Sequence, residues 1–91
     1  MNRLFVYTAP FRTCCKAMGL SDTDLFVLEE ILLDNPQKGA VIEGTGGARK
    51  LRISLNDIRW KSSDGRVIYL DVFEKERLYL LLHIRRMYRK T

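Results

Sequence analysis

The sequence has few of the residues that build metal sites, disulfide frameworks or membrane spans. It contains only two cysteines, Cys14 and Cys15, and a single histidine, His83. Two adjacent cysteines cannot form a disulfide framework, and without a further Cys or His pair no zinc site is expected. The longest uninterrupted apolar run, Leu78 to Leu82, is far shorter than the about 20 residues of a membrane-spanning helix.

The N-terminal segment MNRLFVYTAPF also lacks the features of a signal peptide, because its short apolar patch ends at Pro10 without a small-residue cleavage site. With the sparse cysteines, this predicts a reducing, cytoplasmic location and no membrane association. The chain has 91 residues, of which 46% are apolar and 30% charged. These values are typical of one small domain spanning residues 1–91.

Charge is distributed unevenly along the chain. The net charge is +5, from 16 basic and 11 acidic side chains. Residues 1–47 carry four basic and six acidic groups, a net −2, whereas residues 48–91 carry the other twelve basic and five acidic groups, a net +7. Such a half presents a positive face for which polyanions are the obvious partners. The alternative is a solvated surface that only aids solubility.

The first half of the sequence predicts a strand followed by a helical hairpin. Residues 4–8 form a short apolar run suited to a strand, and Pro10 fits the first turn of a helix that ends at Gly19. Ser21 is the expected N-cap of a second helix that stops at Asn35–Pro36. The apolar faces contain Phe11, Cys14, Cys15 and Met18, then Leu25, Leu28, Ile31 and Leu32.

The second half predicts three strands. Residues 51–55 alternate apolar and polar, residues 66–73 are rich in β-branched and aromatic side chains, and residues 78–84 read as a central strand buried on both faces. Residues 74–77 form a charged hairpin loop between the last two. We therefore expect an α+β domain of order β-α-α-β-β-β, with a helical hairpin on a mainly antiparallel sheet.

The basic side chains gather at the ends of the predicted strands. Because one strand starts beside the end of its antiparallel hairpin partner, Arg66 is expected to lie near Arg85 and Arg86. This convergence favours a phosphate-binding cleft over a merely solvated surface. Arginine suits the task because its guanidinium holds two phosphate oxygens and stays charged. The strand-end and turn bases are Arg49, Lys50, Arg52, Arg59, Lys61, Arg66, Arg85, Arg86, Arg89 and Lys90.

A cleft of this kind has the chemistry for RNA cleavage by the 2′-hydroxyl of the substrate. The reaction needs a base, cations at the phosphorane and an acid for the leaving 5′-oxygen. Arginines supply the cations, and a lysine whose pKa is lowered by like-charged neighbours can supply a proton-transfer group. No carboxylate pair suited to two-metal chemistry stands out, so a metal-free mechanism without cofactors is the better match.

Several other residues have both a functional and a structural interpretation. His83 is a candidate acid or base, but its place in an apolar strand favours a core histidine. Tyr69 and Tyr88 could stack on a base, although Tyr69, in mid-strand, is better explained as core. Residues 44–47 (GTGG) lead into a strand rather than a helix, which argues for a turn and against a P-loop.

The segment from Pro36 to Tyr69 resembles the RelE/HigB family of toxins from bacterial toxin–antitoxin pairs. The family pattern N-P-x-x-G-x-V-I-x-G-T-G-G-x-R-K-x-R is followed by K-S-G-G-x-R-V-I-Y. The matching positions are Pro36, Gly39, Val41, Ile42, Gly44, Thr45, Gly46, Gly47, Arg49, Lys50, Arg52, Lys61, Ser62, Arg66, Val67, Ile68 and Tyr69.

The resemblance implies a RelE-like, microbial RNase-like fold and a ribosome-dependent mRNA endonuclease, or mRNA interferase. It also implies a cognate antitoxin, HigA-like and with a helix-turn-helix domain, as partner beside the ribosome and mRNA. The candidate catalytic residues are Lys61, Arg66 and Arg86. The candidate RNA-binding residues are Arg49, Lys50, Arg52, Arg85, Arg89 and Lys90.

Three departures from the family pattern leave alternatives open. Ile84 stands where the family has a tyrosine, Ser63–Gly65 (SDG) replaces Gly-Gly-x, and the chain ends at Thr91 where relatives continue into a helix. A toxin that binds antitoxin or RNA but cuts poorly is the second hypothesis. A gyrase inhibitor of the ParE branch is the third, and the basic strand ends disfavour it.

Overall fold

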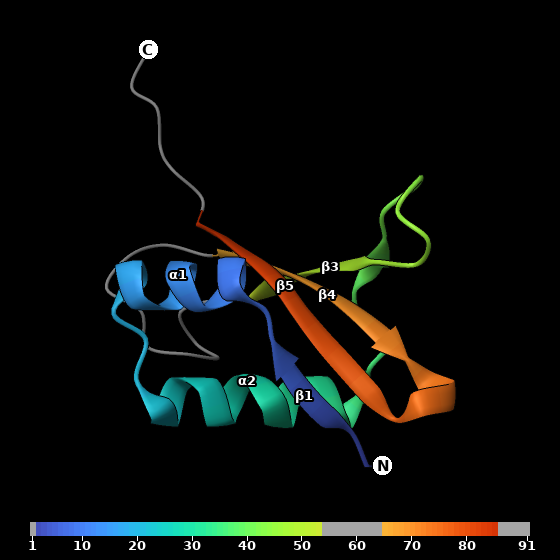
Figure 1. The fold of residues 1–91 in the computed structure, drawn as a ribbon, viewed down its shortest axis with the longest axis horizontal. Helices are drawn as coiled ribbons and strands as arrows, with labels where there is room; N and C mark the ends of the chain where they lie inside the picture. Colours follow the sequence, from blue (N-terminus) through green and yellow to red (C-terminus); the bar gives the residue numbers. More distant parts are fainter. Residues whose placement is uncertain (1, 54–64, 86–91) are drawn as a thin grey trace.

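The structure is a computed structural model that describes residues 2–53 and 65–85. These residues form two α-helices, a short 3-10 helix and a five-stranded sheet of order β1-β5-β4-β3-β2. β1 (Leu4–Tyr7) pairs in parallel with β5 (Arg77–Arg85), and every other pairing is antiparallel. Figure 1 shows the blue helix α1 beside β5 and the teal helix α2 below it. The predicted α+β class, with a helical hairpin on a mainly antiparallel sheet, is confirmed.

Helix α1 (Ala9–Met18) begins one residue before the expected Pro10, which lies in the first turn. The helix ends at Gly19, whose left-handed φ of 69° is open to glycine without a Cβ penalty. The Gly19 and Leu20 amides donate to the carbonyls of Lys16 and Cys15 and so close the last turn. Phe11 and Cys15 face the core, so the structure uses Cys15 as an apolar packing residue.

Helix α2 (Asp22–Asp34) has the start and stop that the sequence predicts. Ser21 is the N-cap and forms a reciprocal capping box with Asp24. Asn35 leaves the helical region before Pro36, which disfavours a helical residue in front of it. Leu28 and Leu32 are fully buried, whereas Leu25 and Ile31 are partly buried against the core.

The strands include one that the sequence analysis missed. β2 (Ala40–Val41) has only two residues and pairs with β3 (Arg49–Ile53), so the observed order has one more strand than predicted. β4 (Gly65–Val72) then pairs with β3 on one side and β5 on the other. The connection between β4 and β5 contains the 3-10 helix η1 (Phe73–Lys75), and it begins and ends one residue earlier than the predicted loop 74–77.

β5 differs from the expectation of a central strand buried on both faces. It lies between β1 and β4, and only its core face is closed, by Leu78, Leu80 and His83. Tyr79 and Leu82 on the other face are half-buried because the helices cover only one side of the sheet. Ile68 pairs with Leu82 but Tyr69 with Leu80, so Leu81 is an extra residue in a β-bulge.

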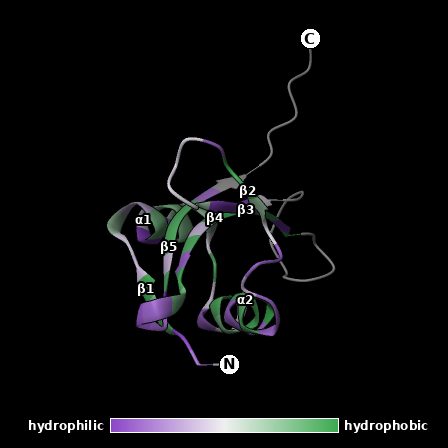
Figure 2. Cartoon of the chain, turned by 90° about the vertical axis from the view of Figure 1, so that its right-hand side faces the viewer, coloured by the Kyte–Doolittle hydropathy of each residue, from purple (hydrophilic) through white to green (hydrophobic). Residues whose placement is uncertain are grey.

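One core joins the helices to the sheet. Phe11 of α1 and Leu28 of α2 belong to the same buried cluster as Leu51, Val67 and other strand residues. This cluster fixes both helices against one face, and no helix among residues 2–53 and 65–85 covers the opposite face of β3 and β4, as the turned view in Figure 2 shows. In the part of the chain that the structure describes, no helix is long and apolar enough to cross a membrane.

Candidate nucleic-acid interface

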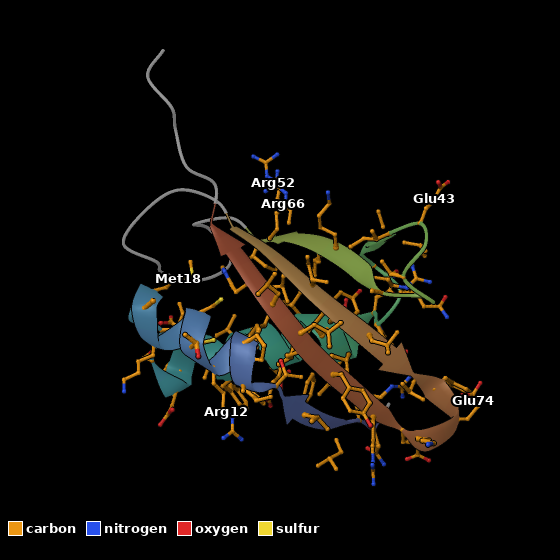
Figure 3. All side chains as sticks on the ribbon, turned by 45° about the horizontal axis from the view of Figure 1, so that its top comes forward. Arg12, Met18, Glu43, Arg52, Arg66 and Glu74 are labelled. Carbon is orange, nitrogen blue, oxygen red and sulfur yellow. The ribbon has the colours of Figure 1, made fainter. Side chains whose placement is uncertain are left out.

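Arg52 and Arg66 lie directly opposite each other in the β3–β4 ladder. Both belong to the register positions that point away from the core, since Leu51, Ile53 and Val67 on either side of them are buried. Opposite residues of an antiparallel pair have Cβ atoms about 4.5–5.5 Å apart. Figure 3 shows the two side chains projecting together from the same end of the sheet.

The pair places two arginine side chains at opposite positions on one face of the sheet. Arg52 is exposed and Arg66 is half-exposed, with one weak contact of 3.5 Å from Arg66 Nη1 to the Gly65 carbonyl. Guanidinium groups at opposite positions of a sheet can both donate hydrogen bonds to one anion. We call Arg52, Arg66 and the adjacent Lys50 the basic patch.

Lys50 extends the basic patch along β3. It is exposed, lies two residues from Arg52 on the same strand face, and pairs with Ile68 of β4. Three of the predicted RNA-binding or catalytic residues therefore share one face of the sheet. At the same end, Gly65 pairs with Arg85 and Arg66 with Ile84. This register agrees with the expectation that the start of one strand meets the end of the next.

Arg49 is placed apart from the basic patch. It alternates with Lys50 and lies on the core side of β3. Its Nη1 donates to the Gln37 carbonyl at 3.1 Å and to the Gly39 carbonyl at 2.8 Å. The guanidinium thus joins the segment after α2 to the sheet, a structural contact that the charge pattern did not predict.

The same segment is held by Tyr69 of β4. The Tyr69 hydroxyl donates to the Pro36 carbonyl at 2.9 Å and accepts from the Gly39 amide at 3.0 Å. Burial raises the pKa of Tyr69, and the side chain has no exposed surface. The core interpretation of Tyr69 is therefore confirmed. We call Pro36, Gly39, Arg49 and Tyr69 the clasp.

Gly39 completes the clasp because its backbone passes very close to Lys50 and Tyr69. A Cβ at this position would lie 3.0 Å from the Lys50 carbonyl oxygen and 3.0 Å from the Tyr69 hydroxyl. The backbone must come this close for Gly39 to donate its amide to the Tyr69 hydroxyl and to accept from Arg49 at its carbonyl. The residues of the sequence motif thus divide into a clasp that shapes the fold and a basic patch on the other face of the sheet.

His83 lies on the opposite face of the sheet from the basic patch. It is 4% exposed, pairs with Val67, and its ring lies 6.3 Å from the ring of Phe11. Burial lowers its pKa to about 4, so the imidazole is neutral at neutral pH. The position is that of a core histidine.

The remaining predicted site residues cannot be placed on this face. Lys61, Arg86, Arg89 and Lys90 lie outside the described residues, as does Tyr88, and of Arg85 only the backbone position in β5 is described. The expected phosphate cleft includes these positions, and it stays a prediction. Among the residues that the structure describes, no group of three His, Cys, Asp or Glu side chains could hold a metal ion.

Comparison with known proteins supports the fold. No family model matches the chain. Among solved structures, the chain is similar to the free-state structure of the E. coli toxin RelE carrying two arginine-to-alanine substitutions, with a TM-score of 0.59 and 18% identity. The match covers 93% of this chain and 84% of that chain. At this level of identity the similarity shows a RelE-like α+β fold.

Proposed function

We propose that the chain is a RelE-like toxin of a toxin–antitoxin pair that cuts mRNA on the ribosome. The observation that supports this most is the pairing of Arg52 with Arg66 on the uncovered face of a RelE-like sheet. Backbone hydrogen bonds hold the two residues opposite each other, so both guanidinium groups can reach one phosphodiester.

The mechanism follows from the charge of the basic patch. Attack of the 2′-oxygen on the adjacent phosphorus forms a phosphorane whose extra negative charge needs stabilisation. Arg66 is proposed to bind a non-bridging oxygen of this species, while Arg52 and Lys50 hold neighbouring phosphates. Lys61 and Arg86 are the candidates for the remaining catalytic groups, with Arg85, Arg89 and Lys90 as further RNA-binding residues.

The test is expression of the chain in growing cells, with primer extension to map cuts in messages. Arg66→Ala should lower the cleavage rate of ribosome-bound message by about 10²–10³-fold, the usual cost of one transition-state donor. Arg12→Ala is the matched control, because Arg12 is an exposed arginine of α1 that projects far from Arg66 (Figure 3). Equal activity of the two variants would remove Arg66 from the site.

A second candidate function is binding of RNA or antitoxin with little cleavage. It is favoured by the register of β4 and β5, which pairs Arg66 with Ile84. The family pattern has a tyrosine at this position, and isoleucine has no proton to donate. If this candidate holds, the chain binds ribosomes without cutting message, and Ile84→Tyr raises the cleavage rate. Growth arrest with gyrase inhibition and intact messages would instead indicate a ParE-like inhibitor.

The proposed antitoxin either covers Arg66, Lys61 or Arg86 directly or keeps the toxin off the ribosome by its bulk. An acidic segment is the simplest means, because opposite charges add contacts and raise the association rate. Charge reversal at Lys61, Arg66 or Arg86 should then weaken the complex. An antitoxin that excludes the toxin from the ribosome by bulk alone would keep its affinity in these variants and at high salt.

A further inference from the structure

A shallow cleft between β1 and α2 shares no residue with the basic patch. It has a volume of about 410 Å³ and is lined by Tyr7, Asp22, Leu25, Phe26 and Glu29. Leu25 supplies apolar surface, and the Phe26 side chain is 62% exposed although it is large and apolar. Phe26 therefore adds an exposed aromatic ring to the wall of the cleft.

The charged groups that line the cleft are both carboxylates, those of Asp22 and Glu29. The Tyr7 hydroxyl donates to Glu29 Oε2, and no described group donates to Glu29 Oε1. Burial, the bond to Glu29 and the nearby charge of Asp22 all raise the pKa of Tyr7, so this hydroxyl keeps its proton. Two carboxylates and two aromatic rings therefore face the same small volume.

No cation of the described chain neutralises these carboxylates. Helix α2 has five acidic residues and no lysine or arginine. The ion pair found among residues 2–53 and 65–85 is the one between Arg3 and Asp71, which lies outside the cleft. A partner that brings a positive charge would thus gain electrostatic complementarity.

The cleft lies next to a free sheet edge. β1 is the edge strand, and no described strand pairs with its outer side. The amides of Leu4 and Thr8 donate inward to the carbonyls of Glu76 and Leu80 of the η1–β5 segment. The backbone groups of the residues between them alternate in direction, so the free edge offers donors and acceptors to an added strand.

We propose that an extended segment of a protein partner adds to the β1 edge and places an arginine side chain in the cleft. Arginine fits better than lysine because its flat guanidinium bonds to a carboxylate in two places and stacks on aromatic rings. Glu29 Oε1 and Asp22 accept its hydrogen bonds, and Phe26 covers its face. This interaction does not depend on the RNA cleavage proposed above.

The test uses the full-length chain and a synthetic hexapeptide, acetyl-TVRVTV-amide, titrated by NMR with backbone amide detection. The expected result is a shift of the Tyr7, Phe26 and Glu29 signals, with the signals of Arg52 and Arg66 unchanged. The same peptide with citrulline in place of arginine keeps the shape without the charge and should bind at least tenfold more weakly. This comparison needs no variant of the chain.

Two variants of adjacent residues give a matched control. Glu29→Gln should weaken the arginine peptide at least tenfold, since glutamine can still accept the Tyr7 hydrogen bond but has no charge. Glu30→Gln makes the same charge change at an exposed neighbour and should alter the affinity less than twofold. Equal weakening by both variants, equal binding of the citrulline peptide, or the same signal shifts with a single-stranded RNA would overturn the proposal.

Discussion

Tyr69 donates its hydroxyl hydrogen bond to the carbonyl of Pro36, 33 residues earlier in the chain. Pro36 follows the end of α2, and Tyr69 lies in β4, which occupies the centre of the sheet. One buried side chain thus positions the segment that leads from the helices into the β2–β3 hairpin. The same strand, β4, carries Arg66 on its other face, so the clasp and the basic patch are built on one element.

The clasp predicts that Tyr69→Phe destabilises the protein. The substitution leaves the Pro36 carbonyl and the Gly39 amide buried without the hydroxyl partner, which costs about 1–3 kcal/mol. For a domain of this size each kcal/mol lowers the melting temperature by roughly 4–8 °C. Calorimetry of Tyr69→Phe beside Tyr79→Phe checks this, because Tyr79 is half-buried on the other face of β5. Equal melting temperatures for the two variants would contradict the role of the clasp.

Gly39→Ala should also destabilise the fold. The added methyl group would lie 3.0 Å from a backbone oxygen that is fixed in the β3 ladder. The segment must then move away and lose the Tyr69 hydrogen bond, at a cost of about 1–3 kcal/mol. Denaturant unfolding measures the loss. In the double variant with Tyr69→Phe the two costs should not add, because both substitutions disrupt one set of contacts.

Elements with local signals were predictable from the sequence. Gly19 ends α1 and Ser21 caps α2 because each acts within its own helical turn. β2 and the bulge at Leu81 carry no such signal, since both depend on hydrogen bonds from strands elsewhere in the chain. Strand existence was therefore easier to predict than strand register.

The site was predictable in composition but not in arrangement. Charge alone grouped Arg49 with Arg52, yet strand alternation turns Arg49 toward the carbonyls of Gln37 and Gly39 and leaves Arg52 on the uncovered face. Arg52 and Arg66 lie opposite each other in only one register of β3 and β4. The residue types in the two strands do not reveal that register.

Burial of His83 predicts that stability falls in mild acid. Its pKa is about 4 in the folded chain and about 6.5 in the unfolded chain, so between these values the unfolded state binds the extra proton. The free energy of unfolding should be unaffected above pH 6.5 and should fall by up to about 3 kcal/mol as the pH approaches 4.

Urea unfolding at several pH values measures this dependence. His83→Leu has no titratable group at that position, so its stability should be nearly constant between pH 7 and 5, above the range where exposed carboxylates titrate. If the free energy of unfolding of His83→Leu falls with pH as steeply as that of the unsubstituted protein, the acid sensitivity belongs to other groups.

The basic patch predicts how RNA affinity depends on salt. Each phosphate neutralised by a protein cation contributes roughly 0.7 to the slope of log affinity against log salt for a single strand. Arg66→Ala and Arg52→Ala should each lower the slope by about that amount, because each removes one phosphate contact.

Arg49→Ala should leave the slope unchanged and lower the melting temperature instead, since its guanidinium bonds to the Gln37 and Gly39 carbonyls. Fluorescence anisotropy with a labelled oligoribonucleotide, across 50–300 mM salt (about the range where such contacts are resolved), separates the two classes of arginine. A reduced slope in Arg49→Ala with unchanged stability would show that the clasp releases this side chain to the RNA.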